Sequence, residues 1–419
     1  MIRRLELLLL GAVIVVAAFS TGWSFLFYLV YLGLLVVGGS YVITRLGLAD
    51  LEAGYAVSQL SSHVGDRIRV TYTIRNTSRI PKPWLEVHNP TSLPAGLPGR
   101  ALGLGAESER SWLVRTPMTR RGHFRVEPLQ VRTGDPFGFF ESAATVGNGV
   151  TVVVYPRIEA LPQWRLPAAN LDGSHAMRER TLQATPLATT VRPWAPGDSF
   201  NRIHWPSTAR HGDIQVKEFD LEQTADAWIV LDLERSVQTG TGDESTTEAA
   251  IRVAASVADK AIQENRAVGI TLAAHRLAQL QPDRGGRQHL KIMQLLAAVD
   301  ADGTSPLSET LVAAVPRIRR GMTAVVITPS LDRTWVKPLS TLRARGVACV
   351  VVSFDTEAYD RFTVDDDRRR HGLPPEPGDP AVAEERRQAA RALRHALAEF
   401  DIPIHVAVPG RPLGDLLVG

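Results

Sequence analysis

The stretch from Ala227 to Asp232, which reads AWIVLD, decides the fold of the second half of this 419-residue chain. Five apolar residues followed by a carboxylate are typical of a strand that is buried on both faces of a parallel sheet. Strand-like and helix-like patterns then alternate to the end of the sequence. This alternation predicts βαβ units, and therefore an α/β domain whose parallel sheet is covered by helices on both faces.

The spacing of the apolar residues sets the expected elements of this α/β domain. Strands are expected at 227–232, 267–273, 323–328, 347–354 and 402–408, and helices at 246–263, 288–299, 308–317, 336–345, 383–400 and 413–417. The charged run Asp365–Arg370 lies in a Pro-containing stretch, 360–380, and is expected to be a solvated loop. Cys349 lies within VACVVVSF and is expected to be a buried, unreactive thiol.

A period of two replaces these patterns in the middle of the chain, at residues 50–156. The segment Arg67–Arg75, RIRVTYTIR, alternates polar and apolar residues, as a strand with one buried face does. Similar short runs, separated by Gly and Pro, recur at intervals of about ten residues and predict an all-β sandwich; they are 84–87, 111–114, 122–126, 129–132 and 150–155. Residues 157–190 lack a sustained period and are interpreted as a connector to the segment 191–419.

The first 49 residues contain two apolar runs, at 5–23 and 25–43. Each is roughly 19 residues long, enough for a helix to cross a ~30 Å hydrocarbon core, so a transmembrane hairpin is expected. Arg3 and Arg4 precede the first run and Arg45 follows the second, which places both termini in the cytoplasm of a multi-pass protein of the inner (plasma) membrane. A cleaved signal peptide is the alternative interpretation of the first run.

Composition narrows the classes of function. Hydrophobic residues make up 44% of the chain and charged residues 22%, which excludes a wholly disordered protein. The 47 bases are nearly balanced by 44 acids, so a nucleic-acid-binding face is not expected. No phosphate-binding loop of the GxxxxGK[ST] type occurs, so any ATP-driven step would belong to another protein. A transport role is disfavoured because two helices cannot enclose a pore alone.

The most distinctive segment runs from Val191 to Asp220. A turn at Gly197 and Asp198 is expected to start a short helix, and 214–219 alternates like a strand. Three interpretations are open: an internal network of ion pairs and stacked rings, a docking site for a partner, and a catalytic Asp198/His204/Ser207 set, which lacks a nucleophile elbow. The residues singled out are Arg192, Trp194, Gly197, Asp198, Arg202, His204, Trp205, Arg210, Lys217 and Glu218.

The motifs RPWAPGD at 192–198, RIHWPSTAR at 202–210 and VKEF at 216–219 resemble the signature of the bacterial domain-of-unknown-function family number fifty-eight. RRGHF at 120–124, TGDPFG at 133–138 and the apolar start of the chain are also similar to that family. The resemblance implies a membrane-anchored protein with a domain similar to von Willebrand factor type A. It also implies a MoxR-type AAA+ ATPase as partner.

The resemblance to von Willebrand A domains directs attention to the end of the first α/β strand, where such domains bind a cation through a D-x-S-x-S loop. Asp232 and Ser236 match this loop, Glu234 replaces its middle serine, and Thr304 matches the distal threonine. Oxygen ligands of this kind suit Mg²⁺ or Mn²⁺. The aspartate expected after the central strand is replaced by Thr328-Pro329-Ser330. Either this degenerate set still holds a cation, or its carboxylates only cap the backbone and pair with a base.

These observations favour a non-enzymatic scaffold or adaptor that is anchored in the membrane lipid. Its von Willebrand A-like domain would bind a protein partner, with a MoxR-type ATPase expected, in assembly or maturation at the membrane. No catalytic residue is assigned. The alternative is a metal-dependent hydrolase that acts at the carboxyl edge of the α/β sheet, where a metal-bound water would need a general base.

Overall fold

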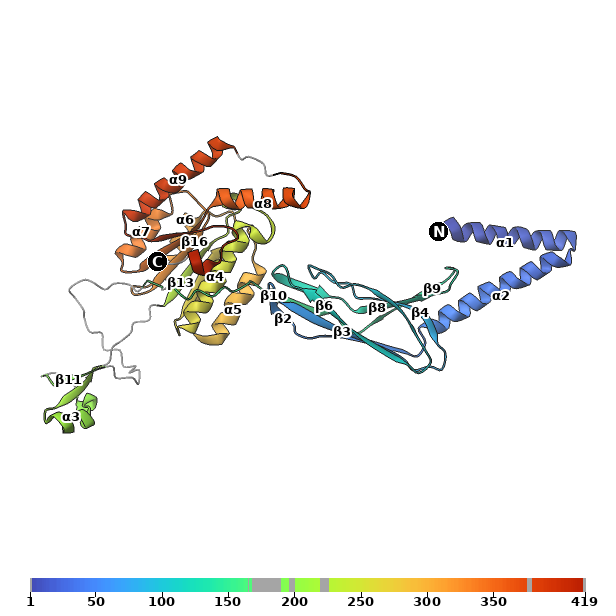
Figure 1. Ribbon diagram of the computed structural model, residues 1–419, viewed down its shortest axis with the longest axis horizontal. Coiled ribbons are helices and arrows are strands. Elements are labelled where there is room, and N and C mark those ends of the chain that lie inside the picture. Colours follow the sequence, from blue (N-terminus) through green and yellow to red (C-terminus); the bar gives the residue numbers. More distant parts are fainter. Residues whose placement is uncertain are drawn as a thin grey trace. The chain divides into compact units, whose positions relative to one another are not determined.

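The computed structural model describes residues 2–164, 166–167, 190–195, 200–218, 226–374 and 379–416 (Figure 1). Two compact units make up the chain. The first comprises Met1–Ile158 and Met293–Val299, and the second comprises Glu159–Ile292 and Asp300–Gly419. Most of the expected connector, and Gly197 and Asp198 of the distinctive segment, lie outside the described residues.

Two helices open the first unit: α1 at Ile2–Thr21 and α2 at Ser24–Gly47. α2 is long and apolar enough to cross a membrane, with a mean hydropathy of 2.1 and only 6% of its apolar window buried. The described apolar part of α1, Leu9–Thr21, is shorter than a span. The structure therefore confirms one helix of spanning length, and the two-pass hairpin stays a prediction.

The last turn of α2 is the part of this helix that packs on the β-strands. Gly47 lies so close to Thr133 that a Cβ on Gly47 would come within 2.6 Å of the threonine methyl group. The buried Lys82 donates a hydrogen bond from Nζ to the carbonyl oxygen of Leu46, at 2.5 Å. This bond occupies a carbonyl that the end of a helix leaves without an intrahelical partner.

Ten strands follow and form three antiparallel or mixed sheets in the first unit. Their orders are β1-β3-β6, β2-β10-β7 and β5-β4-β8-β9. The strands are β1 Leu51–Val57, β2 Ser61–His63, β3 Arg67–Asn76, β4 Lys82–His88, β5 Arg100–Leu104, β6 Glu109–Pro117, β7 Gly122–Val126, β8 Leu129–Gly134, β9 Glu141–Val146 and β10 Val150–Tyr155.

Alternating burial along β3 shows why the strands pack as they do. Ile68, Val70, Tyr72 and Ile74 are buried, while the residues between them are largely exposed. Their side chains join apolar residues of the other sheets in one core, and Tyr72 stacks on Trp112 with ring centroids 5.1 Å apart. The period of two predicted β3, β4, β6, β7, β8 and β10. It missed β1, β2, β5 and β9, which carry few large apolar residues.

The distinctive segment forms a small two-stranded sheet with a helix. β11 at Thr190–Pro193 pairs antiparallel with β12 at Gln215–Glu218. The helix expected from Asp198, brief or interrupted because of Pro206, is interrupted over the described residues: a 3₁₀ turn, η1, occupies Phe200–Arg202, and the helix α3 begins at Trp205 and ends at His211. Pro206 lies in the first turn of α3, where proline costs no backbone hydrogen bond.

The second unit contains a six-stranded sheet in the order β15-β14-β13-β16-β17-β18. Every neighbouring pair is parallel except β14 and the edge strand β15. The strands are β13 Ala227–Asp232, β14 Val268–Ala273, β15 Leu277–Asp283, β16 Thr323–Thr328, β17 Ala348–Phe354 and β18 Ile404–Ala407. The sequence predicted each of them except β15, whose residues are mostly half-buried or exposed.

Helices cover this sheet as the alternation predicted. α6 (Leu307–Ala314), α7 (Val336–Ala344) and α9 (Pro380–Ala398) share one apolar core with the face that carries Trp228 and Val230. α4 (Thr246–Gln263) packs against β13, β14 and β16 and has no residue in that core (Figure 1). α5 at Gly285–Ala298 and α10 at Leu413–Leu416 complete the set.

The charged run Asp365–Arg370 is not a solvated loop, because it forms the last turns of a helix, α8, at Thr356–Arg370. Asp355 caps this helix by accepting a hydrogen bond from the Ala358 amide at 3.0 Å. An Arg370–Asp366 pair at 2.6 Å links successive turns, and cations in the last turn interact favourably with the helix dipole. Local charge pairing therefore supports a helix that has no apolar periodicity.

Candidate functional site

The carboxyl ends of β13 and β16 form the candidate site. Strand order places β13 between β14 and β16, the point from which the sheet extends in both directions, and ligands of open α/β sheets bind at such a point. Asp232, the last residue of β13, is only 3% exposed. Its Oδ2 accepts a hydrogen bond from the Thr328 hydroxyl at 2.6 Å, and its Oδ1 accepts one from the Glu234 amide at 3.0 Å.

Burial dominates the electrostatics of this carboxylate. Removal from water raises the pKa of Asp232 from 3.8 to about 6, although the hydrogen bonds from Thr328 and Glu234 act in the opposite direction. The nearby Glu234 carboxylate raises this pKa further. Asp232 is therefore a carboxylate whose charged form is poorly compensated by the protein, which is the electrostatic environment that a bound cation would relieve.

Glu234 and Ser236 form the outer part of the site. Glu234 is half-buried, and Ser236 is exposed on the 3₁₀ turn η2 at Arg235–Val237. The Ser236 hydroxyl donates a short hydrogen bond of 2.5 Å to Oε1 of Glu234. Glu234, which replaces the middle serine of the D-x-S-x-S loop, is thus held in place by Ser236, the last serine of that loop. No ion pair joins Arg235 to Asp232 or Glu234 within the described part of the chain.

A glycine lets a second loop approach these residues. Gly303 pairs with Glu234 in an isolated parallel bridge, and its amide donates to the Leu233 carbonyl oxygen at 3.1 Å. A Cβ on Gly303 would lie 2.3 Å from the Ala273 carbonyl oxygen, so only glycine fits. The next residue, Thr304, is exposed. Among the described residues its hydroxyl makes no hydrogen bond to the other three predicted ligands.

The structure therefore brings the four predicted cation ligands to one edge, but it does not close them into a complete coordination sphere. No group of three or more His, Cys, Asp or Glu side chains converges anywhere in the described residues. The donor set comprises two carboxylates and neighbouring hydroxyls, which suits a hard cation such as Mg²⁺ or Mn²⁺ in chemical type. Of the two alternatives, backbone capping by Asp232 is directly visible.

Thr328 is the residue of this site that sequence reasoning left without a role. In the sequence, Thr328-Pro329-Ser330 stands where the resemblance places an aspartate, so no ligand role is expected of Thr328. In the structure, Thr328 is fully buried and donates to Asp232, while its Oγ1 accepts a hydrogen bond from the Ser330 amide at 2.9 Å. The available signal was position, because a hydroxyl at the end of β16 must lie beside a carboxylate at the end of β13 in a parallel pair.

The distinctive segment has its own local geometry. His204 precedes α3 and caps it, with Nδ1 accepting from the Ser207 amide at 3.3 Å and lying 2.7 Å from the Ser207 hydroxyl. Trp194 stacks on Phe200 with centroids 6.4 Å apart. This ring contact lies within the segment itself, so the network that would hold the segment to its domain stays a prediction. Ser207 and His204 meet as helix-capping partners three residues apart.

The remaining residues of the segment separate into three groups. Trp205 is 68% exposed, and Arg210 is exposed in the last turn of α3. Arg192 donates to the neighbouring Pro193 carbonyl oxygen at 3.0 Å. For the third group, Arg202, Lys217 and Glu218, the structure describes the backbone alone.

Comparison with known proteins links this chain to uncharacterised relatives. A model of the family "Protein of unknown function DUF58" matches residues 190–358, which include the distinctive segment and the candidate site. The uncharacterised protein YeaD of Bacillus subtilis is 26% identical over 315 residues, 72% of this chain and 75% of that protein. The uncharacterised protein Rv1480 of Mycobacterium tuberculosis is 27% identical over 170 residues, 39% of this chain and 53% of that protein.

Solved structures resemble only parts of the chain. The match to the CARDB domain of the PF1109 protein from Pyrococcus furiosus covers 25% of this chain and 92% of the CARDB chain. The two are 17% identical, with a TM-score of 0.19. The match to a β-glucosidase from Listeria innocua covers 25% of this chain and 16% of the enzyme. The two are 15% identical, with a TM-score of 0.16. Scores this low carry no inference about function.

Proposed function

We propose that this protein is a membrane-anchored, non-enzymatic adaptor whose α/β domain acts as a von Willebrand A-like module and binds a protein partner. The observation that carries the proposal is the position of Asp232, at the end of β13 and beside Thr328 of β16. This is the place where open α/β sheets bind their ligands. In von Willebrand A domains, a cation at this place accepts an acidic group from the partner.

The donor set supports a cation-assisted contact. Asp232 and Glu234 would hold a divalent cation together with the hydroxyls of Ser236 and Thr304. When bound, the cation would neutralise the two carboxylates and offer a coordination position to an acidic side chain of the partner. The residues of this chain supply the fixed positions, because Asp232 is held by two hydrogen bonds and Glu234 by one from Ser236.

Exposed aromatic residues support a protein partner. Trp205 is 68% exposed and Phe200 72% exposed in the distinctive segment. Tryptophan and arginine are enriched among the residues that dominate binding energy at protein interfaces, and Arg210 lies five residues after Trp205 on the same short helix, α3. We propose that a MoxR-type AAA+ ATPase binds the surface formed by Phe200, Trp205 and Arg210 and also the edge at Asp232.

Anchoring in the inner (plasma) membrane is supported by α2. Its apolar side chains are exposed along a helix of spanning length, which would be unfavourable in water. We propose that α1 and α2 together form a hairpin that leaves both termini in the cytoplasm. Attachment of a cysteine-specific or protease-cleavable tag to each terminus, followed by accessibility measurements in spheroplasts, tests this orientation.

A binding experiment with two purified components tests the adaptor function. The full chain in detergent micelles is immobilised, and a MoxR-type ATPase is passed over it with Mg²⁺ or with EDTA. We expect saturable binding that Asp232→Ala and Trp205→Ala each weaken at least tenfold, whereas the exposed-acid control Glu309→Gln on α6 leaves it unchanged. Equal binding by all four proteins, or no binding at all, would exclude this edge as the docking site.

A metal-dependent hydrolase is the second candidate, and the pair of carboxylates at this edge is the observation that favours it. Asp232 would hold the metal, and the half-buried Glu234 would serve as the general base for a metal-bound water. Incubation of the full chain with p-nitrophenyl esters and phosphates, with Mg²⁺ or Mn²⁺, tests this reaction class. Turnover that Asp232→Asn abolishes and Glu309→Gln retains would favour the hydrolase over the adaptor.

A further inference from the structure

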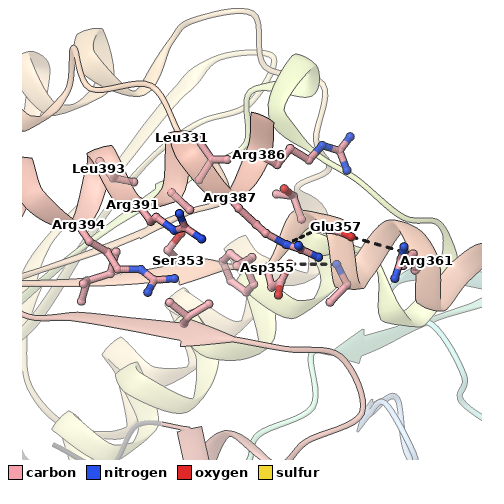
Figure 2. Close-up of a pocket in the computed structure, with 16 residues that line it drawn as sticks. Leu331, Ser353, Asp355, Glu357, Arg361, Arg386, Arg387, Arg391, Leu393 and Arg394 are labelled. Carbon is pink, nitrogen blue, oxygen red and sulfur yellow. Dashed lines mark hydrogen bonds and ion pairs between the residues drawn. The ribbon is translucent and has the colours of Figure 1, made fainter. Parts of the chain in front are cut away.

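A pocket separate from the edge at Asp232 lies in the α/β domain, between the carboxyl end of β17, the start of α8 and one face of α9 (Figure 2). Its volume is about 490 Å³, within the range of small-molecule sites. Five arginines and only two carboxylates line it. None of these residues belongs to the site at Asp232, and the adaptor function makes no use of them.

Most of the positive charge comes from one helix face. Arg387, Arg391 and Arg394 follow each other at intervals of four and three residues along α9, so their side chains emerge on the same side. Figure 2 shows them extending from α9 at the pocket. This arrangement places three guanidinium groups around one volume.

The carboxylates neutralise only part of this charge. Glu357 lies 3.6 Å from Arg361 and 3.7 Å from Arg387, so it is shared between two arginines. Arg386 pairs instead with Asp360 at 3.3 Å. Arg391 and Arg394 form no ion pair with any carboxylate of the described residues. Two guanidinium groups at the pocket are therefore available to an anion.

The inner wall of the pocket supplies an independent polar group. Ser353, near the end of β17, is only 4% exposed and lines the pocket. Among the described residues its hydroxyl forms no hydrogen bond. The hydroxyl oxygen itself keeps access to the pocket, so water or a ligand there can hydrogen-bond to it. The amides at the start of α8 are not equally available, because Asp355 caps that helix.

Apolar residues complete the lining. Leu331, Ile404 and Val406 line the pocket and are half-buried, whereas Phe354 and Leu393 are almost fully buried. A bare inorganic ion would leave the accessible parts of Leu331, Ile404 and Val406 in contact with water. A ligand with an organic body would cover it while its anionic group reached Arg391, Arg394 and Ser353.

We propose that this pocket binds a small soluble phosphate monoester, with the phosphate held by Arg391, Arg394 and Ser353 and the organic body on the half-buried Leu331, Ile404 and Val406. A phosphate group carries up to two negative charges and several acceptor oxygens. It can therefore accept forked hydrogen bonds from arginine and one from a serine hydroxyl at the same time. An extended acidic peptide fits less well, because Ser353 lies inside the pocket and out of reach of a chain that only crosses the mouth.

Isothermal titration of the full chain in detergent micelles tests this proposal, with phenyl phosphate, inorganic phosphate, benzoate and octaglutamate as probes. The variants are Arg391→Ala/Arg394→Ala, Ser353→Val, and Arg369→Ala as an exposed arginine of α8 outside the pocket. Because all substituted arginines are exposed, we expect the variants to fold, which circular dichroism verifies.

We expect one phenyl phosphate per chain, bound more tightly than inorganic phosphate or benzoate. The double arginine variant should lose at least tenfold in affinity and Ser353→Val at least threefold, with Arg369→Ala unchanged. Absence of phenyl phosphate binding, or equal affinity in the double variant, would overturn the site. Binding of benzoate as tight as that of phenyl phosphate would overturn the assignment of a phosphate group. Displacement of phenyl phosphate by octaglutamate at a concentration lower than that of phenyl phosphate would overturn the assignment of a small-molecule ligand.

Discussion

Replacement of Asp232 by asparagine probes the energetic state of the candidate site. The pKa of this carboxyl is 3.8 in an unperturbed chain and about 6 in the folded protein. Because the folded state binds the proton more tightly, the stability that Asp232 contributes is complete below pH 3.8 and is lost as the pH rises through 6. The difference between the two pKa values corresponds to about 3 kcal/mol at pH 8.

Asparagine resembles the protonated carboxyl in shape and cannot ionise. It can still accept a hydrogen bond from the Glu234 amide and can donate one to the Thr328 oxygen. We therefore expect Asp232→Asn to raise the melting temperature of the α/β domain by roughly 3–10 °C at pH 8, and by much less at pH 4. If the Thr328 hydroxyl loses the Asp232 carboxylate as its hydrogen-bond acceptor, the increase in melting temperature is smaller than the full pKa difference implies.

Thermal unfolding of the full chain in detergent with EDTA, followed by the fluorescence of the buried Trp228 and Trp335, provides the assay. The exposed-acid variant Glu309→Gln is the control, with a shift below about 1 °C because exposed substitutions are nearly neutral. Added Mg²⁺ should raise the melting temperature of the wild type at pH 8 and leave Asp232→Asn unaffected. Parallel pH profiles for wild type and Asp232→Asn, or a lower melting temperature of the variant at pH 8, would refute the argument from burial.

Three further predictions concern single positions of the α/β domain. Gly303→Ala should lower the free energy of unfolding of this domain in urea by at least about 2 kcal/mol, because the new Cβ would lie 2.3 Å from a backbone oxygen. The control Gly286→Ala should cause no such loss, because its Cβ would meet no atom within 4 Å. Ser245→Ala should cost about 1 kcal/mol by the same measurement, since Ser245 caps α4, and Ser245→Asp should retain that cap. Cys349 should resist maleimide labelling until the protein is unfolded, because burial raises the pKa of its thiol to about 12.

Local patterns were sufficient where burial is uniform. β13, β16 and α4 begin and end at the residues that the apolar spacing indicated. They failed where the stabilising contacts are not apolar. α8 is held by its Asp355 cap and by charge pairs such as Asp366–Arg370, and β15 is an edge strand with little buried surface.

The candidate site shows the same division. The resemblance to von Willebrand A domains indicated Asp232, Ser236 and Thr304, together with Glu234 in place of the middle serine of the loop. It could not indicate that the Thr328 hydroxyl lies 2.6 Å from the Asp232 carboxylate, because 96 residues separate the two in the chain. The pocket at Ser353 was missed for the same reason, because the arginines of α9 meet β17 only through packing.

The order of residues alone determined the type of most elements, the apolar character of α2 and the burial of Cys349, because each depends on neighbours a few positions away. Tertiary structure decided the strand order β15-β14-β13-β16-β17-β18 and hence which strand ends lie side by side. A carboxylate acquires its pKa, and an arginine its pocket, from groups that are distant along the chain. Only the packing of the sheet and its helices brings those groups within a few ångströms of each other.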